Sequence, residues 1–409
     1  MYRKLSRTAT VVAVTIGGTV ALVGDRTPAR AAETTDATAP IEYRIQLDTL
    51  LPPAKQGNWF QPRPAPMPGL GNGGGPAVVM TIQRALGSDF FTGLSSMRTD
   101  DLGRTWTGPA PVEQLGWRDA EGGMHVGVCD FQLGWHAPTA RVLAIGHTAR
   151  YTRKGFAGFG HRRDTVYSVY DPKTGRWTPW EVFRFPETED DRYFFNGVHG
   201  QWLVEPEGTV LVPFYFVGPK QGFLLTGAVM RCRFDGRKLT YVKHGRELRH
   251  PVPRGLYEKS LTRFRDRYYL TMRNDRKGYV ATSADGLNFG PIRPWTFDDG
   301  KELGSYNTHQ KWVTHSDGLL LVYTRRGADN DHIVRHRAPL FVAQVDPDRL
   351  CVLRDTERIA VPERGRALGN FDATAISPAE TWITVAGGDA YCARLIWSKP
   401  NRLMVAPEK

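Results

Sequence analysis

Residues 99–106 read Thr-Asp-Asp-Leu-Gly-Arg-Thr-Trp, and this stretch decides the predicted fold. The hydroxyl of Thr99 and the carboxylate of Asp101 can accept hydrogen bonds from the backbone of the same loop, as such side chains do in tight turns. Gly103 can take the positive φ that the turn requires. Trp106 then returns the chain to a hydrophobic layer. The stretch predicts a closed polar turn that shapes the fold, and we do not expect it to be catalytic.

Weaker copies of this turn occur elsewhere in the chain. Residues 283–289 read Ser-Ala-Asp-Gly-Leu-Asn-Phe, one residue shorter than the first copy. Hairpin segments that match the pattern less well lie at residues 171–177 and 234–239. Self-similarity at about 40–50 residues is the sequence mark of propellers, which build one blade per repeat. We therefore interpret the chain as a repeat architecture, and the alternative is a set of ordinary β-turns in an unrelated all-β protein.

The rest of the chain reads as short strands separated by turn residues, with almost no helical period. We predict an all-β fold, a single β-propeller of four-stranded blades over residues 41–409, with six or seven blades. Strands of successive blades are predicted to begin near residues 77, 124, 200, 258, 308 and 372. The proline- and glycine-rich residues 52–76 are predicted to lack regular structure.

The last predicted blade lacks a clear fourth strand, and a spare strand is available near the N-terminus. Residues 41–50 alternate apolar and polar side chains, with Ile41, Tyr43, Ile45 and Leu47 on one face. This segment has no other predicted partner. We therefore predict that residues 41–50 complete the last blade and close the ring.

The N-terminus resembles an export signal. Arg3, Lys4 and Arg7 precede an apolar segment over residues 9–23, and Ala29-Arg30-Ala31 offers a small-x-small cleavage site. A membrane anchor is the alternative, but the segment is short and diluted by threonine and glycine. We predict a signal peptide over residues 1–31, a loose mature terminus over residues 32–40, and a secreted protein with no stable membrane association.

The chain is basic: 54 Lys and Arg oppose 42 Asp and Glu, a formal net charge of +12. For an exported protein this balance suits an anionic ligand, and the sequence carries no nucleic-acid-binding motif or lysine-rich run that would predict DNA or RNA as a partner. Cys129, Cys232, Cys351 and Cys392 are widely separated, so they form no zinc-ribbon or redox Cys-x-x-Cys pattern. The sequence is compatible both with disulfides and with buried free thiols at these cysteines.

Unusual polar residues recur at the predicted inner-strand ends, where a propeller brings several blades together at one face. A single histidine of this kind is more often structural, so the argument rests on the recurrence. The predicted catalytic residues are His125, His147, Tyr193 and His199. The predicted substrate-binding residues are Arg150, Tyr151, Asn196, Arg273, Asn307, His309, Gln310, Arg325, Arg326, His332 and Arg335.

Residues 99–106 match every defined position of the Asp box, Ser/Thr-x-Asp-x-Gly-x-Thr-Trp, and so resemble the turns of sialidase-like β-propellers. Residues 307–312, 324–332 and 335–341 resemble a branch of this BNR/sialidase-like superfamily that is distinct from the true sialidases. True sialidases carry a Phe/Tyr-Arg-Ile-Pro motif, whose arginine belongs to a triad that grips the sialate carboxylate. This chain has no such motif, which puts sialidase activity in doubt.

Residues 124–130 and 146–148 resemble inner-strand segments of the rhamnose-α-1,4-glucuronate lyases and related polysaccharide lyases. This resemblance implies a secreted lyase that cleaves a uronate-containing glycan, at a linkage of the rhamnose–glucuronate type, by β-elimination. The expected partner is an anionic oligosaccharide or polysaccharide, and we expect a monomer.

β-Elimination from a uronate requires a base, a group that neutralises the carboxylate, and an acid for the leaving oxygen. Histidine and tyrosine suit the base and the acid, and the arginine fork binds both carboxylate oxygens. We predict that His125, His147 and Tyr193 form the acid–base group. The predicted anion clamp is Arg273, Arg325 and Arg335.

Two other functions stay open. Asp130, Glu258, Asp275 and Asp331 could serve a glycoside hydrolase, which normally uses two carboxylates, and a propeller that binds glycans without cleaving them is the third interpretation. No cofactor is required. The His332-x-x-x-His336 pair lacks the glutamate of a zincin, so we predict no metal there, whereas a structural calcium ion among loop oxygens stays open.

Overall fold

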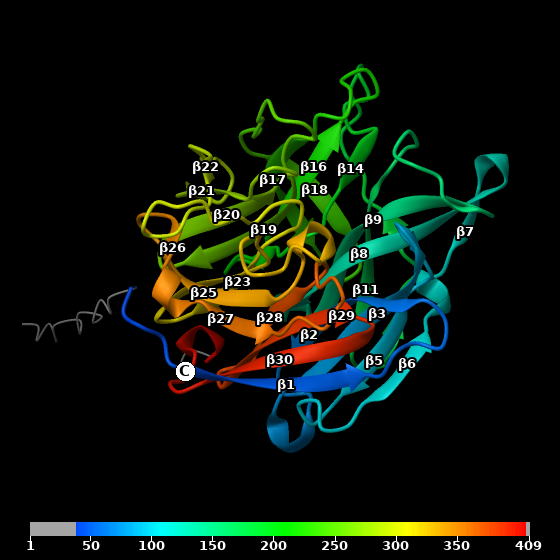
Figure 1. Cartoon of the computed structure of the whole chain (residues 1–409). Coiled ribbons are helices and arrows are strands. Elements are labelled where there is room, and N and C mark those ends of the chain that lie inside the picture. The colour runs from blue at the N-terminus through cyan, green and yellow to red at the C-terminus, as the bar shows by residue number, and fades with distance from the viewer. Residues whose placement is uncertain (1–37, 406–409) are drawn as a thin grey trace, which may run out of the picture. The chain divides into compact units, whose positions relative to one another are not determined.

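Six antiparallel sheets hold nearly all the regular structure of residues 38–405, which the computed structural model describes (Figure 1). The predicted signal peptide lies outside the described residues, as does most of the predicted loose terminus. Within residues 38–405, no helix is long and apolar enough to cross a membrane. The six antiparallel sheets confirm the predicted all-β propeller fold.

The first three sheets follow the chain order with hairpin connections. Sheet one holds β2 (Asn58–Met67), β3 (Ala77–Gly87), β5 (Ser95–Thr99) and β6 (Thr107–Pro111), with β4 (Phe90–Phe91) beside β3. Sheet two holds β7 (Arg118–Ala120), β8 (Met124–His136), β9 (Arg141–Thr152), β11 (Thr165–Asp171) and β12 (Arg176–Trp177), with β10 (Gly155–Phe156) and β13 (Glu181–Val182) attached. Sheet three holds β14 (Phe195–Gly197), β15 (Leu203–Val204), β16 (Val210–Val217), β17 (Thr226–Phe234) and β18 (Leu239–His244).

The last three sheets repeat the pattern. Sheet four holds β19 (Tyr257–Phe264), β20 (Arg267–Arg273), β21 (Tyr279–Ser283) and β22 (Arg293–Pro294). Sheet five holds β23 (Lys311–His315), β24 (Gly318–Tyr323), β25 (Leu340–Asp346), β26 (Cys351–Val352) and β27 (Arg358–Val361). Sheet six holds β28 (Asp372–Ser377), β29 (Glu380–Gly387), β30 (Asp389–Trp397) and β1 (Tyr43–Leu51). Short 3-10 turns occupy some connections: η1 (Asn72–Gly74), η2 (Glu113–Leu115), η3 (Glu121–Gly123), η4 (Ala137–Thr139), η5 (Val334–His336), η6 (Arg354–Thr356) and η7 (Arg402–Met404).

The N-terminal strand closes the last sheet, as predicted. β1 pairs antiparallel with β30 from Tyr43 opposite Trp397 to Leu51 opposite Ala390, so the sheet order is β1-β30-β29-β28. In Figure 1 the blue β1 runs beside the red β30. The fourth strand of this blade therefore comes from the opposite end of the sequence.

The prediction that residues 52–76 lack regular structure is wrong for β2, which is the first strand of sheet one. β2 carries prolines at alternate positions, Pro62, Pro64 and Pro66, and pairs only with β3. Alternate residues of an edge strand point their amides away from the partner, so prolines at these positions remove no ladder hydrogen bond. On the open side, the carbonyl oxygens of Pro62 and Pro64 accept from the hydroxyls of Thr384 and Thr374. The proline content is thus compatible with an inner edge strand.

A buried polar network links strands of sheets two, five and six. Lys311 of β23 donates to the Oε1 of Gln132 on β8 at 2.7 Å and lies 3.3 Å from the carboxylate of Asp372 on β28. Gln132 Nε2 donates to Asp372 at 3.0 Å. Because all these side chains are almost fully buried, each polar group depends on the others for its partner.

The Asp box folds as predicted. The Thr99 hydroxyl accepts from the amide of Gly103 at 2.8 Å, and Asp101 Oδ1 accepts from the amide of Thr105 at 2.9 Å. The hydroxyl of Thr105, which donates to Asp101 Oδ2 at 2.6 Å, and then the amide of Thr105 lower the pKa of Asp101 to about 2. Trp106 packs against Trp382 of sheet six, with 6.1 Å between ring centroids, so the box joins two neighbouring sheets.

The shorter copy of the box is built in the same way. Ser283 Oγ accepts from the amide of Gly286 at 3.1 Å, and Asp285 Oδ1 accepts from the amide of Asn288 at 2.8 Å. Phe289 is buried at the end of this turn. The four cysteines, which the sequence left open, are buried free thiols.

Candidate active site

A cavity of about 180 Å³ opens where the first strands of the sheets meet the loops around them. Its polar lining includes Asp130, His147, Arg163, His199 and Glu258. These residues come from sheets two, three and four and from the connections between their strands. The cavity is therefore built from segments that are far apart in the sequence.

Backbone irregularities aim three of its polar side chains. Gln61 on β2, Asp130 on β8 and Glu258 on β19 have φ of 53°, 56° and 41°, and each lies where the pairing of its strand shifts register. A β-bulge turns a side chain away from its regular direction, and a non-glycine residue in this region costs about 1–3 kcal/mol. Asn307, just before β23, repeats the feature with φ of 51°. The same device therefore recurs on several sheets around one cavity.

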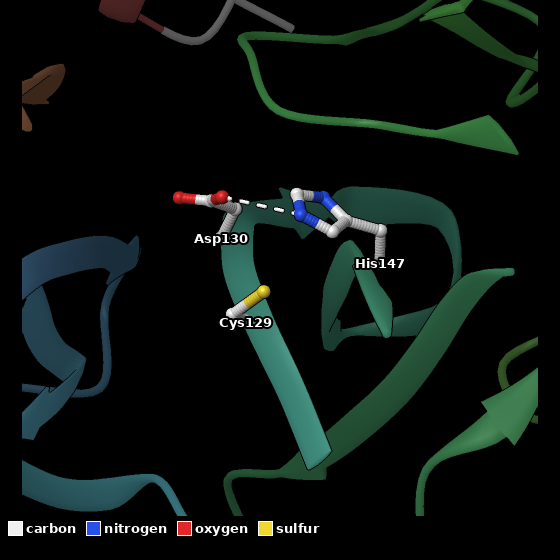
Figure 2. Close-up of side chains that lie close together, drawn as sticks. All are labelled: Cys129, Asp130 and His147. Carbon is white, nitrogen blue, oxygen red and sulfur yellow. Dashed lines mark ion pairs between the residues drawn. The ribbon is translucent and has the colours of Figure 1, made fainter. Parts of the chain in front are cut away.

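Asp130 lies between two histidines. Its Oδ2 is 3.4 Å from His147 Nε2, and its Oδ1 is 2.8 Å from His199 Nδ1, a contact that is close but not aligned as a hydrogen bond. Figure 2 shows Asp130 directed toward His147, with Cys129 on the same strand. Burial opposes ionisation, but His199 and His147 outweigh it and hold the pKa of Asp130 far below its usual value. Asp130 is therefore a carboxylate.

Glu258 forms the second anionic centre. It is ion-paired with Arg273, and its Oε2 lies 3.8 Å from His199 Nε2 and 3.7 Å from His309 Nδ1. Burial would raise the pKa of Glu258, but the charge of Arg273 outweighs this effect and keeps the pKa well below its usual value. Arg273 also donates to the Oδ1 of Asn307 at 2.7 Å. Both terminal nitrogens of the Arg273 guanidinium group therefore donate hydrogen bonds.

Three arginines of the cavity have no carboxylate partner. Among the described residues, no ion pair involves Arg163, Arg335 or Arg337, although all three line the cavity. Arg337 donates to the carbonyl oxygen of Asn307 at 2.6 Å, and burial together with the charges of Arg273 and Arg335 lowers its pKa to about 9. Unpaired guanidinium groups in a partly desolvated cavity favour an anionic ligand.

A base and an acid lie beside one of these arginines. His147 Nδ1 donates to the carbonyl oxygen of Val198 at 3.1 Å, because that oxygen can only accept, and this leaves a lone pair on Nε2. Burial and then the charge of Arg163 lower the pKa of His147 to about 3, so it is neutral. Tyr215 lies 6.3 Å away between ring centroids and accepts from Arg163 at 3.2 Å. Burial raises the pKa of Tyr215 to about 12, so it keeps its proton.

Aromatic side chains form one wall of the cavity. Phe156, Phe159, Phe195 and Phe223 line it, and Phe159 is 41% exposed. Arg163 lies over the ring of Phe195, 4.6 Å from its centroid. Such a wall offers an apolar surface next to charged groups, a combination that suits a sugar ring bearing a carboxylate.

The structure brings part of the predicted site together. His147, His199, Arg273 and Arg335 line the cavity. Three more predicted residues lie directly behind it: Asn307 and His309 contact Arg273 and His199, and Asn196 donates to the carbonyl oxygen of Arg163 at 3.2 Å. The roles of these residues stay predictions.

The other predicted residues lie elsewhere. His125 is partly exposed at the start of β8, where it contacts Asp119, and Tyr193 contacts His244 at 3.3 Å. The predicted acid–base group of His125, His147 and Tyr193 is therefore not assembled around the cavity. Arg325 is ion-paired with Glu357, which leaves the predicted clamp of Arg273, Arg325 and Arg335 without one member. The remaining residues also bond outside the cavity or lie buried: Arg150, Tyr151, Gln310, Arg326 and His332.

The sequence did not predict several polar residues of the cavity lining as site residues, among them Arg163, Tyr215, Tyr257 and Arg337. Asp130 and Glu258 were considered only for the hydrolase alternative. The sequence signal for these two is only a carboxylate within a β-forming segment, and it does not show that the strand shifts register there. No comparable signal marks Arg163, which lies in an irregular segment between β10 and β11.

Comparison with known proteins shows which solved structures have a similar fold. No protein-family model matches the chain, and no curated protein matches it. A Trypanosoma rangeli sialidase, solved in complex with sialic acid, is 11% identical with a TM-score of 0.56 over 86% of this chain and 58% of that chain. A Hadza microbial sialidase is 11% identical with a TM-score of 0.57 over 85% of this chain and 66% of that chain.

This chain has a sialidase-like β-propeller fold. A protein of unknown function from Dyadobacter fermentans also matches, with 13% identity and a TM-score of 0.54 over 86% of this chain and 99% of that chain. The chain spans only about three-fifths of the length of the T. rangeli sialidases, at 59% in one comparison. At these identities the likeness shows the fold alone, so the resemblance to the lyase branch stays a prediction.

Proposed function

We propose that the cavity binds a uronate that carries a sugar on its O4 near the end of a glycan, and that it cleaves this glycosidic bond by β-elimination. The observation that carries this proposal is the grouping of His147, Tyr215 and Arg163. These three side chains supply a neutral base, a protonated acid and a guanidinium with no carboxylate partner, side by side. They are the three groups that elimination from a uronate requires.

The arginines would hold the substrate carboxylate. Arg163 and Arg337 both line the cavity and have no ion-pair partner among the described residues. A carboxylate between them would relieve the repulsion among the cavity's positive charges. It would also withdraw electron density from C5 of the uronate and acidify the C5 proton, which is otherwise difficult to remove.

His147 Nε2 would take the C5 proton. The pKa of His147 is low partly because of Arg163, so a substrate carboxylate that pairs with Arg163 would raise the basicity of His147 when it is needed. The electrons of the C5–H bond would form the C4–C5 double bond as the C4–O bond breaks. Asp130, 3.4 Å from His147 Nε2, would stabilise the imidazolium.

Tyr215 would give its proton to the leaving oxygen. Arg163, which donates to the Tyr215 hydroxyl at 3.2 Å, would stabilise the phenolate that results. The phenolate could then recover the proton from solvent or from His147. Tyr215 thus takes the role that the sequence assigned to Tyr193.

The size of the cavity supports action at a chain end. Its volume of about 180 Å³ is smaller than the ~300–1,000 Å³ of ordinary ligand pockets. A space of this size suits a uronate near a chain end better than one within a long stretch of polymer. The rhamnose–glucuronate linkage is proposed from the sequence resemblance alone.

Hydrolysis of a terminal acidic sugar is the second candidate. Tyr257, which lines the cavity, donates to the carboxylate of Asp275 and lies between Arg254 and Arg273. A tyrosine activated by a carboxylate can act as a nucleophile. Against this candidate, Asp130 and Glu258 are both ionised and ion-paired, so neither carries the proton that a hydrolase acid must donate.

One experiment separates the two reactions. The mature protein is incubated with oligosaccharides that end in a sugar 4-O-linked to a uronate or that end in a sialate, and the ultraviolet absorbance of the products is followed. Elimination creates a conjugated double bond that absorbs, whereas hydrolysis does not. His147→Gln and Tyr215→Phe should abolish the signal, and Tyr193→Phe, which lies outside the cavity, serves as the matched control. Cleavage without an absorbing product would favour hydrolysis by Tyr257.

We further propose that the six sheets are six blades of one ring, and that the protein is exported as a monomer. Contacts between first strands support the ring: β2 contacts β8 and β28, β23 contacts β28 and β19, and sheet three contacts both β9 and β19. The leader-like residues 1–31 support export.

A further inference from the structure

We propose that His199, His309 and Glu258 form a site for one Zn²⁺ ion in the wall of the cavity. The three donor atoms are His199 Nε2, His309 Nδ1 and Glu258 Oε2. The reaction proposed above does not need this ion, and its presence can be measured without any substrate. The inference therefore fails or holds separately from the proposed function.

The hydrogen bonds of the two imidazoles fix where their protons lie. His309 Nε2 is 2.9 Å from the carbonyl oxygen of Phe371, which can only accept, so Nε2 carries the proton. His199 Nδ1 is 2.8 Å from a carboxylate oxygen of Asp130, a contact that is not aligned as a hydrogen bond, but two acceptors would repel at this distance and we therefore place the proton on Nδ1. In the neutral rings the lone pairs are therefore on His199 Nε2 and His309 Nδ1.

These two lone-pair nitrogens face each other at 2.9 Å. Two acceptors held this close in a buried site repel unless a cation lies between them. Glu258 adds a negative charge beside the same two atoms. The arrangement therefore demands a positive charge at this point, which is either a metal ion or an extra proton.

The geometry favours a metal ion. The sides of the donor triangle measure 2.9, 3.8 and 3.7 Å. Zinc bonds of ~2.0–2.2 Å in tetrahedral geometry separate neighbouring donors by roughly 3.3–3.5 Å, which lies within the range of these sides. A shared proton would need only the two nitrogens, whereas a metal ion would also use the oxygen of Glu258 that lies beside both of them.

The surroundings match those of a metal centre. Ligating histidines usually donate their other nitrogen to a carboxylate or a carbonyl. His309 does so toward Phe371, and His199 Nδ1 lies 2.8 Å from the carboxylate of Asp130 without the alignment of a hydrogen bond. Arg273, ion-paired with Glu258 and bonded to Asn307, would hold the glutamate in place. Because His199 and Glu258 line the cavity, the fourth position of the ion would face it. Two histidines and one carboxylate suit Zn²⁺ better than Ca²⁺ or Mg²⁺.

Metal analysis tests the inference directly. The mature chain, prepared without a polyhistidine tag, is dialysed against Zn²⁺ and then against metal-free buffer, and zinc is counted by mass spectrometry. We expect one zinc per chain, and Co²⁺ in its place should give the visible absorption of a tetrahedral site. A chelator should lower the melting temperature of the loaded protein.

Variants locate the ion. Glu258→Gln and His309→Gln should weaken zinc binding by roughly 100-fold. Loss of a residue that only supports a metal ligand already costs about 10–100-fold in affinity, and loss of a ligand should cost at least as much. His136→Gln removes another buried histidine, bonded to Thr139 and Gly208 far from these donors, and should keep the zinc. If His309→Gln fails to fold, Glu258→Gln still decides. A folded wild-type protein that retains no zinc, or variants that keep it, would overturn the proposal and leave a shared proton as the occupant.

Discussion

The Asp box and the central cavity are both built from polar side chains and positive-φ residues, but they satisfy their polar groups over different distances along the chain. In the box, Thr99 and Asp101 bond groups no more than four residues away. In the cavity, His199 contacts His309, 110 residues away. The buried pair Gln132 and Asp372 is separated by 240 residues. The box is therefore a local structure, and the cavity exists only after the sheets have assembled.

The two regions also differ in what remains unpaired. The box carboxylate Asp101 accepts hydrogen bonds from its own loop. The cavity keeps Arg163 and Arg337 without carboxylate partners. We infer that the box stabilises the fold, whereas the unpaired arginines of the cavity lower the stability of the fold and serve ligand binding.

Deleting residues 32–50 should abolish cooperative unfolding of the whole domain. β1 supplies the outer strand of sheet six, so its loss exposes the edge of β30 and part of the core that Tyr43, Ile45 and Leu47 cover. Thermal unfolding followed by circular dichroism measures the effect. Deleting residues 32–40 alone is the control and should change little. A longer truncation that melts like the intact protein would contradict the closure of the ring by β1.

Replacing His147 with Gln should lower kcat by roughly 10²–10⁴ while the melting temperature changes little, because a lost general base has this effect. Steady-state kinetics and thermal unfolding are measured on the same sample. Since the pKa of His147 in the free protein is about 3, wild-type kcat/KM should show no acidic limb near the ~6.5 of an ordinary histidine. Wild-type rates in His147→Gln would remove His147 from the reaction.

Replacing Trp106 with Ala should lower the free energy of unfolding by about 2–3 kcal/mol and leave turnover unchanged. Full truncation of a buried tryptophan costs ~3–5 kcal/mol, and Trp106 is only partly buried between Trp382 and its neighbours. Denaturant unfolding and an activity assay give the two readouts. A stable variant without turnover would place the box in the active site and erase the contrast between the two regions.

Replacing Arg337 with Met should raise the free energy of unfolding by about 1–2 kcal/mol and weaken binding of the acidic sugar. The pKa of Arg337 falls to about 9 because burial and two neighbouring arginines disfavour its charge, so the folded state gains when that charge is removed. Asp101→Asn is the opposite case and should lower the melting temperature without affecting binding. An Arg337→Met protein with a lower free energy of unfolding would show that the guanidinium group stabilises the fold.

The sequence predicts much of the fold because its signals are local. The Asp box and the β-forming segments depend on neighbours within a few residues, and the strand starts near residues 124, 258 and 372 were predicted from them. β2 was missed because its prolines indicate a loop unless the strand is known to lie at an inner edge. The spare N-terminal strand was assigned to the right blade because only one blade lacked a partner.

The site was predicted only in part, because it depends on contacts between distant segments. His147 and His199 were found from their recurrence at inner-strand ends, and the same reasoning selected His125 and Tyr193, which lie outside the cavity. Two features decide which polar residues face it: the register shifts at Asp130 and Glu258, and the position of the irregular segment that carries Arg163. Neither feature has a pattern along the sequence that marks it.

The central claim is that the unpaired arginines of the cavity hold a sugar carboxylate, and equilibrium binding tests it most directly. Calorimetric titration compares a glucuronate-terminated oligosaccharide with the same compound after its carboxyl group has been reduced to an alcohol. The account predicts measurable binding of the acid to the wild-type protein and binding of the alcohol weaker by roughly 100-fold, as expected when a charge-assisted pair of ~2–3 kcal/mol is lost. Arg163→Met should narrow this difference, because Arg337 still faces the cavity. Equal affinity of the wild-type protein for the acid and the alcohol would contradict the account.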